Sequence, residues 1–362
     1  MLSSSSFSIE RALQLFQKEQ TVNSKTSGDD VVSYRVTRHF YSDSMRVEQS
    51  MDIYQPYHGT RGSTEDMPII ILVMGSGWLG HAWWLYSVFN WWNASGPKTI
   101  ASLGYTCISI RHSGAFLSKF GIFFVAAVGA GIEMLRSKQQ SDSCALGTPT
   151  YVWVFFALLV LLYLQGRGAA TLEEMVHDVE TATRYIQQNS EEILRFKSNF
   201  KHGRRKIILG GYSSGGHVVA TLLSQRTAES YFSQNTAVIG ILYLSGVLSL
   251  NCRAMNLITS VVFGRCHIPS PLGSRPPCLS VPHLMVGCEK ELFGIPLLDG
   301  ALCAQQYHTW LQEDLGYTSK CVLVQNSNHW SILSSGRLRL ALEEHLPWLL
   351  QQYNANTNII QK

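Results

Sequence analysis

The chain has 362 residues and a net charge of +4, and only 15% of its residues are charged, against about 25% in a typical soluble domain. This length suits one large α/β domain with an insertion, or two ordinary domains. The small positive excess, with no basic block longer than Arg204–Lys206, argues against nucleic-acid binding. The cysteines form no CxxC pair, so no metal site is expected.

The N-terminal residues 1–30 are predicted to form a polar tail, with a short amphipathic helix at 9–17. They lack the basic start and apolar core of a signal peptide. The remaining residues, 31–362, are predicted to form one domain. It begins with two alternating segments, SYRVTRHF and RVEQSMDIYQP, which are typical of an antiparallel strand pair.

Six apolar runs then follow, each of the kind that marks a strand buried on both faces of a sheet. They occupy residues 68–78, 105–114, 206–214, 237–247, 281–290 and 320–330. Helical patterns alternate with them at 171–188, 215–231, 299–315 and 334–353. The predicted fold is therefore α/β, with a mostly parallel, doubly wound sheet of eight strands.

One insertion, residues 114–165, interrupts this alternation. Two apolar runs, 115–135 and 151–165, flank a polar loop. Each is close to the roughly 20 residues that a membrane-spanning helix needs. We expect a hydrophobic hairpin that enters a membrane, and two core helices of a lid are the alternative. The basic residues on either side do not fix an orientation.

The sequence GGYSSGGH, residues 210–217, lies where a strand should pass into a helix. Read as G-x-S-x-G, it matches a nucleophile elbow, a turn so sharp that glycine is needed two residues before and after the serine. Gly211 and Gly215 satisfy this spacing for Ser213. For Ser214 the position two residues before would be Tyr212, which does not fit. Ser213 is therefore the candidate nucleophile.

A serine nucleophile needs a histidine base, which in turn needs an orienting acid. His329 follows the last predicted strand and lies in the turn NSNHWS, where parallel sheets present catalytic groups. His217, His283 and His345 fall within predicted helices or strands and are interpreted as packing residues. His329 is the candidate base.

The candidate acid follows the preceding strand. The segment GCEKELFG offers Glu289 and Glu291, and no aspartate. We expect Glu291 to be the acid, with Glu289 as the alternative. The developing negative charge also needs donors, and the bend MGSGW after the first buried strand exposes backbone amides. The amides of Ser76, Gly77 and Ser214 are expected to form the oxyanion hole.

These motifs together resemble the α/β-hydrolase superfamily. The chain is most similar to its esterase/lipase branch, which includes hormone-sensitive-lipase-like esterases, kynurenine formamidases and isoprenylcysteine methylesterases. The likeness covers about residues 33–112 and 168–350. The segments that carry it are DIYQP, MGSGW, YTCISIRHSG, HDVETATRYI, GYSSGG, LSGV and NHWSIL.

The resemblance implies that Ser213 is acylated, that His329 is the base, and that no cofactor is needed. The chain departs from the branch in three places. Met74 stands where the usual HGGG motif has histidine, glutamates replace the usual aspartate, and the insertion 114–165 lies outside the common pattern.

The expected function is cleavage of carboxylic esters through an acyl-enzyme intermediate, on a small or lipid-like substrate at an intracellular membrane. Four tryptophans between residues 83 and 92 either pack in a core helix or line an apolar acyl pocket. The alternatives are acyl transfer or amide cleavage by the same residues, and a non-catalytic membrane scaffold. The sequence does not indicate an oligomeric state.

Overall fold

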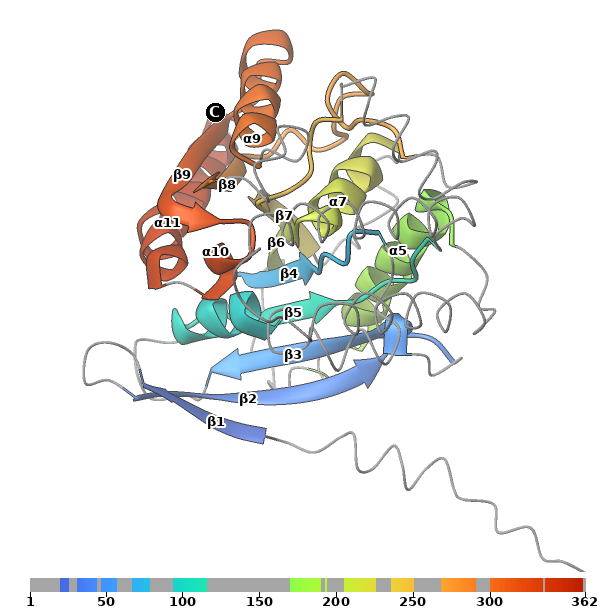
Figure 1. Ribbon diagram of the computed structural model, residues 1–362, viewed down its shortest axis with the longest axis vertical. Coiled ribbons are helices and arrows are strands. Elements are labelled where there is room, and N and C mark those ends of the chain that lie inside the picture. Colours follow the sequence, from blue (N-terminus) through green and yellow to red (C-terminus); the bar gives the residue numbers. More distant parts are fainter. Residues whose placement is uncertain are drawn as a thin grey trace, which may run out of the picture.

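The computed structural model places a central sheet with helices on both of its faces (Figure 1). The residues it describes are 20–25, 31–43, 47–56, 67–78, 94–115, 170–189, 193, 205–225, 236–250, 268–290, 300–334 and 336–360.

The sheet of the described residues has nine strands in the order β1-β2-β3-β5-β4-β6-β7-β8-β9. Their bounds are β1 Gln20–Lys25, β2 Val31–Phe40, β3 Ser50–Pro56, β4 Ile69–Val73, β5 Cys107–Ile110, β6 Arg205–Tyr212, β7 Thr236–Leu244, β8 His283–Lys290 and β9 Ser319–Asn328. The last six strands in this order, from β5 through β4 to β9, pair in parallel. The first three pair antiparallel and join the parallel part through β3 and β5.

All eight predicted strands are present, as β2 to β9, so the predicted fold class is confirmed. The additional strand, β1, was not predicted. It lies within residues 1–30, which we expected to form a polar tail, and it pairs with β2 from Gln20↔Val36 to Lys25↔Val31. Its sequence, QTVNSK, has little apolar alternation, so the pairing with β2 defines it as a strand.

The helices also agree with the predicted pattern. Their bounds are α5 Leu172–Gln188, α7 Ser214–Gln225, α9 Gly300–Thr309, α10 Ser331–Ser334 and α11 Gly336–Ile360. Short turns of other helix types occupy Val47–Gln49 (η1) and Trp310–Asp314 (η5), and residues 94–102 are helical. Helix α5 begins with a capping box, in which Thr171 and Glu174 satisfy each other's backbone amides.

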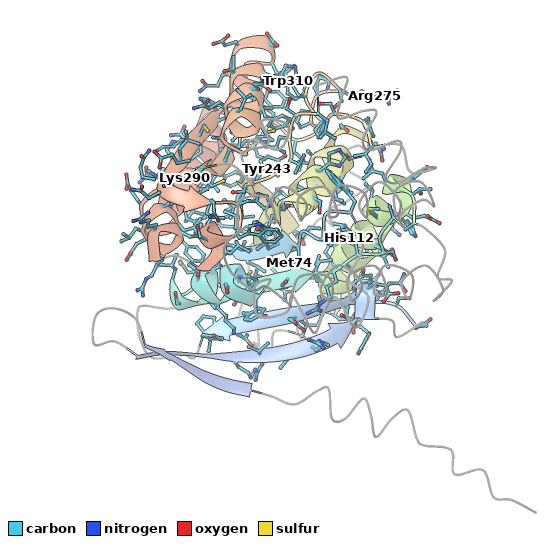
Figure 2. All side chains as sticks on the ribbon, in the orientation of Figure 1. Met74, His112, Tyr243, Arg275, Lys290 and Trp310 are labelled. Atoms are coloured by element: carbon cyan, nitrogen blue, oxygen red, sulfur yellow. The ribbon has the colours of Figure 1, made fainter. Side chains whose placement is uncertain are left out.

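The core has two layers because the parallel strands are buried on both faces. Neighbouring residues of β4 belong to different layers: Ile71 and Val73 pack with α5, α7 and α9, whereas Ile70 and Leu72 pack with α10, α11 and residues 94–102. Figure 2 shows Met74 and Tyr243 within the molecule and Arg275 at its edge. This alternation explains the uninterrupted apolar runs in the sequence.

Most of the predicted insertion, residues 116–165, lies outside the described residues, as do the four tryptophans between 83 and 92. Within the described part of the chain, no helix combines the length and apolar character that crossing a bilayer requires. Cys107, Cys278 and Cys288 form no disulfide among the described residues, and Cys107 and Cys288 are buried.

An ion network joins the antiparallel strands to the parallel part of the sheet. Asp52 of β3 accepts hydrogen bonds from Arg38 of β2, at 2.7 Å to Nε, and from Arg111, which follows β5. Burial alone would raise the pKa of the Asp52 carboxyl, but the two guanidinium groups outweigh burial and lower the pKa from 3.8 to about 2. The network therefore stabilises the folded chain most when Asp52 is ionised.

This network predicts a specific pH dependence of stability. Because the pKa of Asp52 is lower in the folded chain, ionised Asp52 adds about 2 kcal/mol to the free energy of unfolding. This contribution is complete above about pH 4 and is lost as the pH falls towards 2. Urea unfolding across this range measures it. Asp52→Asn should lower stability at pH 7 and remove this part of the acid dependence, whereas Asp314→Asn, at an exposed site, should retain it. An unchanged acid dependence in Asp52→Asn would contradict the assignment.

Candidate active site

Ser213 lies at the turn between β6 and α7. It has a φ of +53°, in the left-handed region that residues other than glycine rarely adopt. Its neighbours Tyr212 and Ser214 are buried, whereas Ser213 is partly exposed. The turn therefore presents the Ser213 side chain at the carboxyl end of the parallel strands, as a nucleophile elbow does.

Close packing explains the two glycines of the elbow. A Cβ atom on Gly211 would lie 2.4 Å from the carbonyl oxygen of Gly215. A Cβ atom on Gly215 would lie 2.1 Å from the carbonyl oxygen of Val73, at the end of β4. Both contacts are with backbone atoms, which cannot move aside as a side chain can. The expected role of Gly211 and Gly215 thus has a direct geometric reason.

The structure brings His329 to Ser213, 116 residues away in sequence. His329 follows β9, and its Nε2 atom lies 2.8 Å from the Ser213 Oγ atom. This distance suits donation of the serine proton to an unprotonated Nε2. Burial lowers the pKa of His329 to about 4, so the imidazole is neutral near pH 7 and can accept a proton.

The loop after β4 packs against the nucleophile. A Cβ atom on Gly75 would lie 2.6 Å from both the Ser213 Cβ and the Tyr212 carbonyl oxygen, so only glycine fits there. Gly77 and Trp78 both have positive φ, at +62° and +64°. The segment MGSGW is therefore a bend at the serine.

The second serine of the elbow has a contact that the sequence did not reveal. The backbone amide of Ser76 donates a hydrogen bond to the Ser214 hydroxyl at 3.0 Å, and Ser214 is fully buried. This bond joins two of the three residues expected at the oxyanion hole. The signal in the sequence was the repeated serine itself, since the elbow turn does not require a hydroxyl after the nucleophile.

The structure describes only one of the two candidate acids, Glu289. Glu291 lies outside the described residues. Glu289 is exposed on β8, and its Oε2 atom accepts a hydrogen bond from the backbone amide of Asn326. Asn326 has a φ of +52° and lies three residues before His329. Glu289 therefore contacts the backbone of β9, three residues before His329.

Each of the three histidines interpreted as packing residues from the sequence contacts neighbouring groups. His217 is fully buried in α7, where its Nδ1 atom accepts from the indole of Trp78 at 3.4 Å and its Nε2 atom donates to the carbonyl of Pro269 at 2.7 Å. His283 of β8 packs against the rings of Tyr243 and Tyr317. His345 of α11 lies 3.2 Å from the Lys320 amine.

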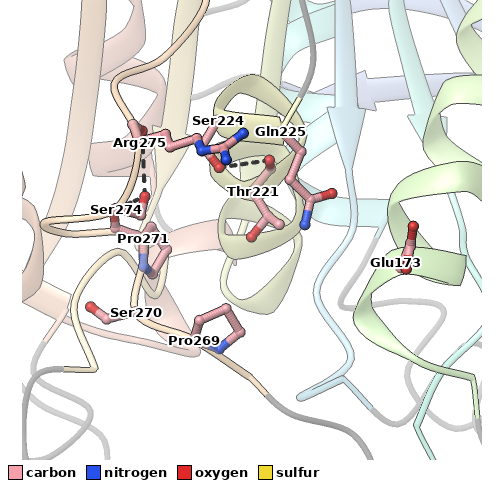
Figure 3. A pocket seen from close by; sticks show the side chains of 9 residues that line it. All are labelled: Glu173, Thr221, Ser224, Gln225, Pro269, Ser270, Pro271, Ser274 and Arg275. Atoms are coloured by element: carbon pink, nitrogen blue, oxygen red, sulfur yellow. Dashed lines mark hydrogen bonds between the residues drawn. The ribbon is translucent and has the colours of Figure 1, made fainter.

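A cavity of about 340 Å³ lies near the other end of α7 (Figure 3). It is lined by Glu173, Thr221, Ser224, Gln225, Pro269, Ser270, Pro271, Ser274 and Arg275. Several of its hydroxyl groups bond to the backbone: Ser224 donates to the carbonyl of Thr221, and Ser274 to that of Pro271. None of the candidate catalytic residues lines this cavity. Among the described residues, no group of His, Cys, Asp and Glu side chains could hold a metal ion.

Comparison with known proteins identifies the fold. No profile of a known protein family matches the chain, and no curated protein matches its sequence. Among solved structures, a truncated carbohydrate esterase from gut microbiota is 13% identical over 94% of this chain and 98% of its own, with a TM-score of 0.52.

Esterase B from Lactobacillus rhamnosis is 14% identical over 90% of this chain and 89% of its own, with a TM-score of 0.54. The same esterase inhibited by a tributyrin phosphonate matches equally well. The likeness extends over nearly the whole of each chain. Together with the strand order and the elbow, it shows that this chain has the α/β-hydrolase fold.

Proposed function

We propose that this chain is a serine hydrolase that cleaves carboxylic esters, with Ser213 as nucleophile and His329 as base. The observation that carries the proposal is the 2.8 Å distance between Ser213 Oγ and His329 Nε2 at an elbow with positive φ. A histidine that only packs in the core is not expected to lie within hydrogen-bonding distance of a serine with a strained backbone. The esterase names of the structural neighbours agree with the proposal.

The geometry supports a two-step reaction. His329 accepts the Ser213 proton while Oγ attacks the ester carbonyl, and the tetrahedral intermediate collapses as the imidazolium returns that proton to the leaving alcohol. Water then attacks the acyl-enzyme while His329 takes its proton, and the imidazolium returns that proton to Ser213 Oγ as the acid is released. The neutral imidazole at pH 7 starts the cycle in the correct protonation state.

The proposed oxyanion donors are the backbone amides of Ser76, Gly77 and Ser214. They lie on the two segments that meet at Ser213, the bend after β4 and the start of α7. The Ser76 amide already donates to the Ser214 hydroxyl, so an oxyanion would share that donor with Ser214 Oγ. Such fixed amides stabilise negative charge without reorganising during the reaction.

Aryl esters of graded acyl length, from acetate to palmitate, test the activity. The purified chain is expected to release the phenol and the free acid, with kcat/KM rising with acyl length if the acyl pocket is apolar. Equal assays with the matching anilides separate ester from amide cleavage, and an added alcohol that appears as new ester would identify acyl transfer. A folded protein that cleaves none of these substrates would favour the non-catalytic scaffold.

We also propose that the chain works at an intracellular membrane on a hydrophobic ester. The support comes from the sequence: the low charged fraction and the apolar runs at 115–135 and 151–165. Fractionation of cells that express the full chain tests this. Retention in carbonate-washed membranes supports the proposal, whereas recovery in the supernatant would make the insertion a lid.

The orienting acid can be assigned through the pH dependence of kcat/KM. We propose Glu291, because Glu289 already bonds the backbone at Asn326. A carboxylate at His329 Nδ1 favours the imidazolium and raises its pKa from the value of about 4 that burial produces. The base must be neutral, so activity falls as the pH drops through this pKa.

Glu291→Gln should therefore lower kcat/KM by about 10³- to 10⁴-fold and move the acid limb of its pH profile to lower pH. Glu289→Gln keeps an oxygen that accepts from Asn326, so it should leave the limb in place and lower kcat/KM by less than about tenfold. The reverse pattern would make Glu289 the acid.

A further inference from the structure

Tyr212 joins the elbow to the loop of the base. It is the last residue of β6, directly before Ser213, and only 3% of it is exposed. Its hydroxyl donates a hydrogen bond of 2.7 Å to the backbone carbonyl of His329, 117 residues later in the chain. One buried side chain thus links the strand that carries the nucleophile to the backbone of the base.

The ring of Tyr212 also faces the imidazole. The centroids of the Tyr212 and His329 rings lie 5.3 Å apart, with 31° between their planes. Trp330 contacts the same imidazole edge-on, with centroids 5.7 Å apart and 88° between the planes. Two aromatic rings from different elements therefore limit how the imidazole can turn, and they shield it from water.

Other hydrogen bonds near His329 either lie within its turn or join the end of β9 to β8. The Asn328 side chain accepts from the amides of Trp330 and Ser331, which fixes the turn internally. Glu289 ties Asn326 to β8, the neighbouring strand. The Tyr212 hydroxyl, in contrast, bonds the His329 backbone to β6, the strand that ends directly before Ser213.

We propose that Tyr212 is a positioning residue for catalysis: its hydroxyl holds the His329 backbone, and its ring holds the imidazole, at the distance that proton transfer from Ser213 requires. The inference rests on the proposed function of this site. The elbow turn does not demand tyrosine at this position, since its tight contacts fall on Gly211 and Gly215. A buried phenylalanine would supply the same packing without a hydroxyl to satisfy.

The test compares Tyr212→Phe with Tyr34→Phe, a buried tyrosine of β2 whose ring packs against Tyr54. Rates are expressed per site titrated with a phosphonate, so misfolded protein does not enter kcat. Tyr212→Phe is expected to lower kcat by about 10- to 100-fold with KM within about twofold of wild type, because small displacements of a base are costly. Tyr34→Phe should leave both constants near wild type.

A second variant separates the ring from the hydroxyl. Tyr212→Phe keeps the ring, so the acid limb of kcat/KM should stay in place. Tyr212→Leu removes the ring and admits water to the imidazole, so the limb should move to higher pH. A purely structural role would lower the melting temperature without moving this limb.

The proposal is overturned if Tyr212→Phe keeps kcat within twofold of wild type, or if Tyr212→Leu leaves the limb unmoved. A different result marks failure of the proposed function itself: wild type without ester hydrolysis, or Ser213→Ala with full activity. The two failures are therefore distinguishable in one set of assays.

Discussion

Replacing Ser213 with alanine is expected to lower kcat/KM for ester hydrolysis by at least about 10⁴-fold. In the proposed mechanism, the Ser213 oxygen 2.8 Å from His329 Nε2 forms the acyl-enzyme, and without it the base has no nucleophile to activate. The remaining amides can still polarise a carbonyl, so a small residual rate is expected. Initial rates with an aryl ester measure the effect.

Ser214→Ala provides the matched comparison, because the two serines are adjacent. It keeps the backbone amide but loses the hydroxyl that accepts from Ser76, so we expect a fall of only about tenfold. If Ser214→Ala were the inactive variant and Ser213→Ala the active one, the nucleophile would be misassigned.

Replacing His329 with glutamine is expected to cause a loss of similar size, about 10⁴-fold or more. Glutamine keeps a polar side chain and leaves the backbone carbonyl that bonds Tyr212, but its amide cannot take a proton from Ser213 near pH 7. The same substitution at His177, which is 63% exposed on α5, is the control and should have no effect on the rate.

The effects of the Ser213 and His329 substitutions are also expected not to multiply when the two are combined. Because serine and histidine act as a unit in the proposed mechanism, Ser213→Ala combined with His329→Gln should be hardly slower than either single variant. Losses that multiply in the double variant would contradict a shared mechanism. Near-wild-type activity of His329→Gln alone would remove it as the base.

Local patterns were sufficient to predict the parallel sheet and the elbow. The buried strands can be recognised by continuous apolar runs, as in IIILV of β4, because both faces of the sheet are covered. The glycines at 211 and 215 reveal the elbow because their spacing follows from a turn with no room for Cβ atoms. His329 could be selected because it follows the last strand.

Contacts between distant segments could not be read from the sequence. Strand β1 has no strong pattern of its own and depends on pairing with β2. The bond from Tyr212 to His329 and that from Ser76 to Ser214 each join residues more than a hundred positions apart. Nothing local marks them, since a tyrosine or serine serves many packing roles. The choice between Glu289 and Glu291 likewise depends on the tertiary arrangement around His329.

The most direct test of the account is labelling of the purified full-length chain with a fluorophosphonate, followed by intact mass and peptide mapping. An activated serine attacks phosphorus and displaces fluoride, so the account predicts one adduct per chain, located on Ser213 and absent from Ser213→Ala and His329→Gln. A folded wild-type chain that gains no adduct, or that carries it on Ser214, would contradict the account.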